Sequence, residues 1–172
     1  MKRSLTGLAL ALLLTGLSAT LATGSGASAA QLGSRALNTP FRDDRSTAAA
    51  VLRSLYNAVN RREYARAYSY YAEAPRPYAQ FVRGYADTLA VSLSLGPVQS
   101  EGAAGSVYST VPVRLRALQR GGKEQVFVGC YVLRQIQPTL QEPPFEPIGI
   151  TAGHLRRASV SAPRPERTLC AD

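Results

Sequence analysis

The sequence predicts an α+β domain in which two or three N-terminal helices pack on a curved antiparallel sheet. Apolar residues recur at helical spacing between residues 46 and 84. From Thr88 onward they alternate instead with a period of two, as in strands that bury one face. Gly121-Gly122 separates two alternating segments and predicts a hairpin. Helices followed by a run of strands are typical of an α+β fold, with the helices on one face of the sheet.

Three helices are expected in the N-terminal half of the domain. Ser46 or Thr47 suits the N-cap of the first helix, which is expected to end at Asn60. Asn60 and Glu63 have the spacing of a capping box for a second helix. A third, shorter helix is expected from Pro77 to Gly84, because proline is favoured in the first turn of a helix and glycine at its end.

Four strands are expected after the helices, and they cover residues 88–95, 107–117, 124–136 and 148–156. The strand 124–136 is apolar on both faces, with Val126 and Val128 on one side and Tyr131 and Leu133 on the other. A strand of this kind lies in the centre of a sheet that is covered on both sides, or at a subunit interface. A homodimer through the sheet is therefore one expectation for this chain.

The first thirty residues have the pattern of a signal peptide. A basic start, Met1-Lys2-Arg3, is followed by an apolar run from Leu8 to Leu17 and then by small residues that favour cleavage after Ala29 or Ala30. The apolar run is shorter than the roughly 20 residues that cross a bilayer, and nothing later in the chain is apolar enough to do so. We expect a periplasmic or secreted protein with no membrane span after signal removal.

The remaining chain divides into three parts. Residues 31–45 show no periodicity and are expected to form a flexible leader, residues 46–158 form the domain, and residues 159–172 form a C-terminal tail. The tail contains Pro163 and Pro165, which continue neither a helix nor a strand.

Composition restricts the possible functions. The 172 residues include one histidine and two cysteines, too few for a zinc site or an iron–sulfur cluster, so no metal or other cofactor is expected. The formal net charge is +9. The arginines are scattered, however, and do not alternate with aromatic residues as in a groove that stacks bases, so nucleic acid is not an expected partner.

A family resemblance extends over residues 46–158. The motif Asn60-Arg61-Arg62-Glu63-Tyr64-Ala65-Arg66-Ala67-Tyr68, the element Phe81-x-x-Gly84-Tyr85 and the strand pair joined by Gly121-Gly122 are similar to the NTF2-like superfamily, whose fold is the cystatin-like cone. The resemblance implies a cone-shaped cavity between the helices and the sheet. Members of the superfamily use this cavity for binding, for isomerase or dehydratase chemistry, or as plain scaffold.

The two cysteines predict a disulfide between Cys130 and Cys170. Their number is even, and the expected compartment is oxidising. The alternative is a nucleophilic Cys130 paired with His154, which requires a thiolate in an electropositive, accessible position. The valines that flank Cys130 do not provide such a position.

The tyrosines are the candidate ligand-binding residues. All nine lie between Tyr56 and Tyr131, and a tyrosine combines an apolar ring with a polar tip, which suits a pocket wall. The residues expected to line the cavity are Tyr56, Tyr68, Phe81, Tyr85 and Tyr131. The segment Pro138 to Pro147, which contains Phe145, is interpreted either as a lid over the cavity or as a rigid connection.

These observations favour a non-catalytic role, either binding of a small apolar ligand or interaction with another protein. The alternative is a small lyase or isomerase. Ketosteroid-isomerase-type members combine a carboxylate base with a tyrosine, and the resemblance implies Asp87 in that role. His154 is the other candidate base, because alternation places it on the face of Ile150 and Ala152. The two hypotheses differ in whether Asp87 or His154 points into the cavity.

Overall fold

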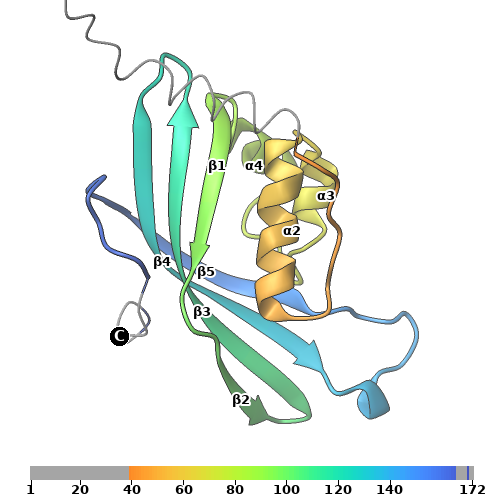
Figure 1. Ribbon diagram of the computed structural model, residues 1–172. Coiled ribbons are helices and arrows are strands. Elements are labelled where there is room, and N and C mark those ends of the chain that lie inside the picture. Colours follow the sequence, from red (N-terminus) through yellow and green to blue (C-terminus); the bar gives the residue numbers. More distant parts are fainter. Residues whose placement is uncertain (1–38, 166–169, 171–172) are drawn as a thin grey trace, which may run out of the picture.

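A computed structural model of the chain describes residues 39–165 and Cys170 (Figure 1). The predicted signal peptide and residues 31–38 of the predicted leader lie outside the described residues. No helix within the described part of the chain has the length and apolar character needed to cross a membrane.

The three helices lie close to their predicted positions. They are α2 (Ala48–Asn60), α3 (Tyr64–Tyr68) and α4 (Tyr78–Gly84). Thr47 caps α2, since its hydroxyl accepts a hydrogen bond from the amide of Ala50 at 3.1 Å. Helix α3 ends at Tyr68 because the next residues pair with the last strand, where the amide of Ile150 donates to the carbonyl of Tyr70 at 2.9 Å.

The strands form an open antiparallel sheet. They are β1 (Thr88–Leu95), β2 (Gln99–Ala103), β3 (Ser106–Gln119), β4 (Glu124–Ile136) and β5 (Gly149–Ala158). The order is β1-β3-β4-β5, and β2 also pairs with β3, next to β1 along the same edge. Four of these strands were predicted. Strand β2 was missed because its residues are polar or small and mostly exposed, so they show no apolar alternation.

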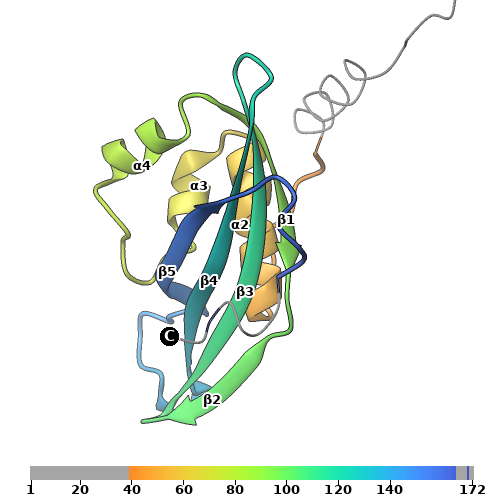
Figure 2. The same ribbon diagram turned by 90° about the vertical axis from the view of Figure 1, so that its left-hand side faces the viewer.

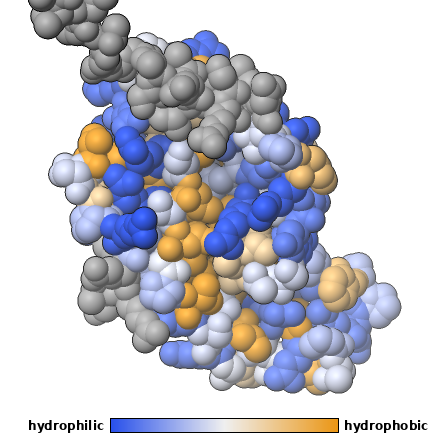
Figure 3. Space-filling view, in the orientation of Figure 1, coloured by the Kyte–Doolittle hydropathy of each residue, from blue (hydrophilic) through white to orange (hydrophobic). Residues whose placement is uncertain are grey.

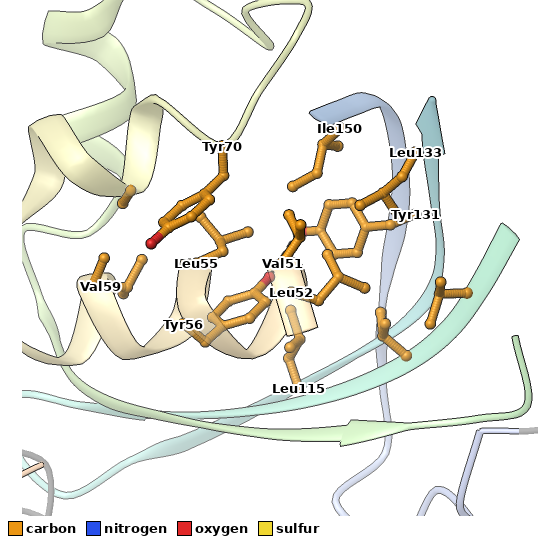
Figure 4. Close-up of a cluster of buried hydrophobic side chains, with 14 of the residues drawn as sticks. Val51, Leu52, Leu55, Tyr56, Val59, Tyr70, Leu115, Tyr131, Leu133 and Ile150 are labelled. Carbon is orange, nitrogen blue, oxygen red and sulfur yellow. Dashed lines mark hydrogen bonds between the residues drawn. The ribbon is translucent and has the colours of Figure 1, made fainter. Parts of the chain in front are cut away.

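The helices cover one face of the sheet and form the core with it (Figure 1). Figure 4 shows the long helix α2 packed across the inner face, with side chains from the helix and from the strands in contact. The fully buried apolar side chains include Val51, Leu52, Leu55, Tyr70, Val111, Val113, Leu133 and Ile150. The predicted α+β class is therefore confirmed at the level of a few helices packed on an antiparallel sheet.

Asn60 joins the end of α2 to the edge strand. Its side-chain amide donates to the carbonyl of Val91 at 2.9 Å and accepts from the amide of Val91 at 2.7 Å. The predicted capping box with Glu63 is wrong, because the Asn60 side chain is occupied by β1 and Glu63 instead forms ion pairs with Arg61 and Arg66. Asn60 therefore forms its side-chain hydrogen bonds with Val91, which is distant in sequence, and not with the neighbouring second helix.

The opposite face of the sheet is covered by the chain that follows β5. Figure 2 shows this segment crossing the strands on the side away from the helices. A guanidinium nitrogen of Arg114 on β3 donates to the carbonyl of Val160 at 2.8 Å, and Pro165 is buried. The outward valines Val126 and Val128 are only 1% and 4% exposed. Strand β4 is therefore central and covered on both sides within one chain.

The predicted disulfide is confirmed between Cys130 and Cys170, whose Cα atoms are 5.6 Å apart. Cys130 lies on the outer face of β4 and Cys170 near the end of the tail. The bond therefore attaches the C-terminal tail to the middle of the sheet.

Residues 39–45 belong to the folded domain, although the sequence places them in a flexible leader. The side chain of Asn57 on α2 accepts from the amide of Arg42 at 3.0 Å and donates to the carbonyl of Pro40 at 2.7 Å. The lack of periodicity correctly indicated the absence of a helix or strand here. Periodicity gives no information on the hydrogen-bond partners that buried polar side chains of α2 need. Residues 39–45 supply these partners.

The surface is largely hydrophilic. The face shown in Figure 3 has a narrow apolar strip along its middle, between polar groups. The large apolar residues most exposed in the described part include Phe41, Leu140 and Phe145, which lie far apart in the sequence or on loops.

Candidate functional site

A cavity of about 400 Å³ lies between the inner face of the sheet and the segment that carries α3 and α4. Its walls combine apolar and polar side chains, and the apolar ones include Phe81, Val91, Leu115, Phe127 and Leu155. This volume lies within the usual range for sites that bind small molecules.

Four of the five residues predicted to line the cavity do so. They are Tyr56 from α2, Phe81 from α4, Tyr85 after α4 and Tyr131 from β4. Tyr68 does not line it. Its ring packs edge-on against Phe81, with ring centroids 5.4 Å apart. Tyr68 therefore contacts a residue of the cavity wall but does not line the cavity itself.

Tyr71 and Arg76 also line the cavity and were missed from the sequence. Tyr71 lies seven residues after Tyr64 in the apolar stripe of the predicted second helix. This spacing was the sequence signal that could have placed Tyr71 on the inner side of the domain. For Arg76 no local pattern was available, because it lies in the irregular segment before α4 and reaches the cavity only through the tertiary fold.

Three tyrosine hydroxyls meet inside the cavity. The hydroxyl oxygens of Tyr56 and Tyr131 are 2.6 Å apart, and the hydroxyl of Tyr71 lies near enough to interact electrostatically with that of Tyr131. Figure 4 shows Tyr56 and Tyr131 approaching each other from the helix and the sheet. The hydrogen bond between Tyr56 and Tyr131 uses one of their two O–H donors. The cluster therefore retains donor capacity beyond this bond.

These hydroxyls remain protonated at neutral pH. Burial raises the pKa of Tyr56 well above its usual range, and the neighbouring Tyr131 adds to this effect. Burial likewise raises the pKa values of Tyr71, Tyr85 and Tyr131. The cluster can therefore donate and accept hydrogen bonds, but it holds no tyrosinate that could act as a base or nucleophile.

Asp87 does not reach the cavity. It is exposed in the turn before β1 and is not among the residues that line the cavity. Its backbone carbonyl accepts a hydrogen bond from the amide of Arg120, directly after β3, at 2.8 Å.

His154 is also exposed, and it lies on the outer face of the sheet. Strand β5 carries a bulge: Ile150 pairs with Leu133, but Ala152 pairs with Val132, which leaves one extra residue in β5. The bulge reverses the alternation, so His154 pairs with Cys130 on the outer face while its neighbours Gly153 and Leu155 line the cavity. The prediction that His154 shares a face with Ile150 is wrong for this reason.

The segment 138–147 contributes none of the residues that line the cavity. Phe145 is 72% exposed, and the segment continues from the far end of β4 as a short 3-10 helix, Pro138–Leu140. The structure therefore supports a connection between β4 and β5, and not a lid over the cavity.

The described residues contain no group of three or more histidine, cysteine, aspartate or glutamate side chains placed to hold a metal ion. Among the cavity-lining residues, Arg76 is the charged one, and the other polar side chains are tyrosines, Thr88, Gln119 and Gln125. The cavity can bind through apolar contact, hydrogen bonds and one positive charge.

Comparison of the chain with protein-family models, with curated proteins and with solved structures finds no match. The cavity geometry is therefore the basis on which a function is proposed.

Proposed function

We propose that this chain is an exported NTF2-like domain that binds a compact, mainly apolar molecule in its cavity without converting it. The resemblance of the motifs around Asn60 and Phe81 supports the family, and the observed order of helices and strands is compatible with it. The cavity volume of about 400 Å³ suits a molecule of one to three rings.

The observation that carries the proposal is the tyrosine hydroxyl cluster in a cavity that also has apolar wall residues. Tyr56 and Tyr131 are each 4% exposed, so they lie at the buried end of the cavity. An O–H donor that the tyrosines do not use between themselves can donate a hydrogen bond to a ligand oxygen. The expected ligand therefore has an apolar body and an oxygen acceptor at the end that enters first.

Binding is a better explanation than acid–base catalysis. General acid–base chemistry needs a titratable group within hydrogen-bond reach of the reacting atom. Neither Asp87 nor His154 lines the cavity, and the tyrosine hydroxyls stay neutral. The isomerase or lyase alternative thus lacks its base in this arrangement.

Interaction with another protein through the sheet has less support. Val126 and Val128 were the reason to expect a homodimer, and in this chain they are buried. A second subunit would reach them only if the segment after β5 moved away from the sheet.

The proposed export is supported by the disulfide. A bond between Cys130 and Cys170 persists in an oxidising compartment, which agrees with the signal-peptide pattern of residues 1–30. Periplasmic or secreted localisation can be tested by fractionating the cells that make the protein.

Binding can be measured with the neutral fluorophore N-phenyl-1-naphthylamine, whose emission rises in an apolar site. We expect one bound probe per chain in the wild type. Ala117→Leu fills part of the cavity and should weaken binding at least tenfold, because Ala117 lines it. Ala65→Leu is the matched control, since Ala65 is exposed on α3 and does not line the cavity.

The result that would overturn the proposal is a wild type that does not bind the probe, or an Ala117→Leu variant that binds it as tightly as the wild type. Circular dichroism of both variants shows whether they are folded, so that a loss of binding is not mistaken for unfolding.

A further inference from the structure

Arg76 lies at the mouth of the cavity without a counter-ion. It is exposed in the segment between α3 and α4 and lines the cavity beside Tyr85. Within the part of the chain that the structure describes, its guanidinium has no ion pair and no hydrogen bond to a side chain. Some arginines of the described chain, such as Arg66 and Arg116, are paired with glutamates, and others are not. Arg76 differs from the other unpaired arginines because it lines the cavity.

The guanidinium is close enough to influence the cavity. Burial raises the pKa values of Tyr71 and Tyr85, and the positive charge of Arg76 acts against this by lowering both. Because Coulomb interactions weaken with distance and with water between the charges, this places the charge of Arg76 beside the two tyrosines. The cavity therefore has apolar and hydroxyl-bearing walls, and Arg76 is the one charged side chain among the residues that line it.

The lining contains no carboxylate that could neutralise this charge. An arginine without a counter-ion attracts anions. Its planar guanidinium can bind a carboxylate through two parallel hydrogen bonds. The formal net charge of +9 also favours the approach of an anion.

We propose that the ligand is a small organic carboxylate, whose apolar body enters the cavity and whose carboxylate is bound by Arg76 at the mouth. This inference rests on the proposed binding function and specifies the class of ligand. A neutral molecule of the same shape binds through the apolar walls alone, and it therefore binds more weakly.

The test compares two probes with the same rings, 2-naphthoate and 2-naphthamide, by isothermal titration calorimetry at low salt. We expect the wild type to bind the carboxylate at least tenfold more tightly than the amide. Arg76→Gln should remove this preference, so that the variant binds the carboxylate no more tightly than the amide. Arg83→Gln is the matched control, because it removes the same charge from an exposed residue of α4 that does not line the cavity.

The ligand class is overturned if the wild type binds both probes equally, or if Arg83→Gln reduces the preference as much as Arg76→Gln does. In that case binding of the neutral fluorophore shows that the cavity still works as a binding site. If neither the fluorophore nor the two naphthalene probes bind, the proposed function fails together with the ligand class.

Discussion

Single tyrosine residues combine two roles in this protein, since they fill the core and also present polar groups to the cavity. Tyr131 is central to both, because its ring packs in the core and its hydroxyl forms a hydrogen bond with that of Tyr56. Buried hydroxyls are stable only when they are hydrogen-bonded. The loss of one hydroxyl therefore affects the residues that depend on it.

We expect Tyr131→Phe to lower the free energy of unfolding by about 1–3 kcal/mol, since it leaves the buried hydroxyl of Tyr56 without its hydrogen-bond partner. Chemical denaturation measures this change. Tyr108→Phe serves as the control, because Tyr108 on β3 is half-buried and its hydroxyl has no hydrogen bond to a described residue. Equal losses in the two variants would contradict the role assigned to the cluster.

The raised pKa values of these tyrosines predict how stability depends on alkaline pH. In the unfolded chain a tyrosine loses its proton near pH 10, while burial keeps Tyr56, Tyr71 and Tyr131 protonated in the folded protein. The unfolded state alone gains this ionisation, so stability is unaffected below about pH 10 and falls as the pH rises above it. Absorbance at 295 nm should therefore stay below the value of the denatured protein until the protein unfolds. Complete ionisation of the tyrosines in a protein that keeps its native circular dichroism would refute this.

Among the elements, the pairing of strands β4 and β5 determines which side chains line the cavity. The bulge in β5 turns Gly153 and Leu155 toward the cavity and His154 away from it. The partner strand accommodates the close approach of β5 with a glycine. Gly129 has φ +154°, and a Cβ atom there would clash with the backbone carbonyl of His154.

Gly129→Ala should therefore destabilise the protein by more than about 2 kcal/mol, since both the backbone conformation and the available space exclude a side chain. Gly102→Ala is the matched control. Gly102 lies on the exposed strand β2, and a Cβ atom there meets nothing within 4 Å. Thermal unfolding compares the two variants, and a similar small change for both would show that the strands tolerate a side chain at position 129.

At the level of the whole molecule, the C-terminal tail completes the fold. It covers the outer face of β4 and is attached to that strand by the disulfide between Cys130 and Cys170, which are separated by 40 residues in sequence. The closed loop restricts the unfolded chain, for which the chain-entropy model predicts about 4 kcal/mol of stabilisation.

Replacing both cysteines by alanine should lower the free energy of unfolding by roughly this amount, about 2–4 kcal/mol. Adding a reducing agent to the wild type should produce a similar loss, and adding it to the double variant should produce none. Urea denaturation measures all four conditions. A wild type whose stability is insensitive to reduction would contradict the role of the disulfide.

The sequence alone determined the α+β class, the positions of the three helices and four of the five strands, the disulfide, and four residues of the cavity wall. These features follow from local patterns. Apolar spacing reports which residues of an element face the core, as for Val111 and Tyr131, and two cysteines in a chain expected to be exported have one way to pair within it.

Only the tertiary structure decided which polar groups face the cavity. The bulge that moved His154 outward depends on the pairing of β5 with β4, and one extra residue is enough to reverse the alternation of a strand. Arg76 and the partner of Asn60 were likewise beyond prediction, because each is brought to its contacts by elements distant in sequence. Periodicity describes how a residue is oriented within its own element, whereas the composition of a site depends on how separate elements are placed against each other.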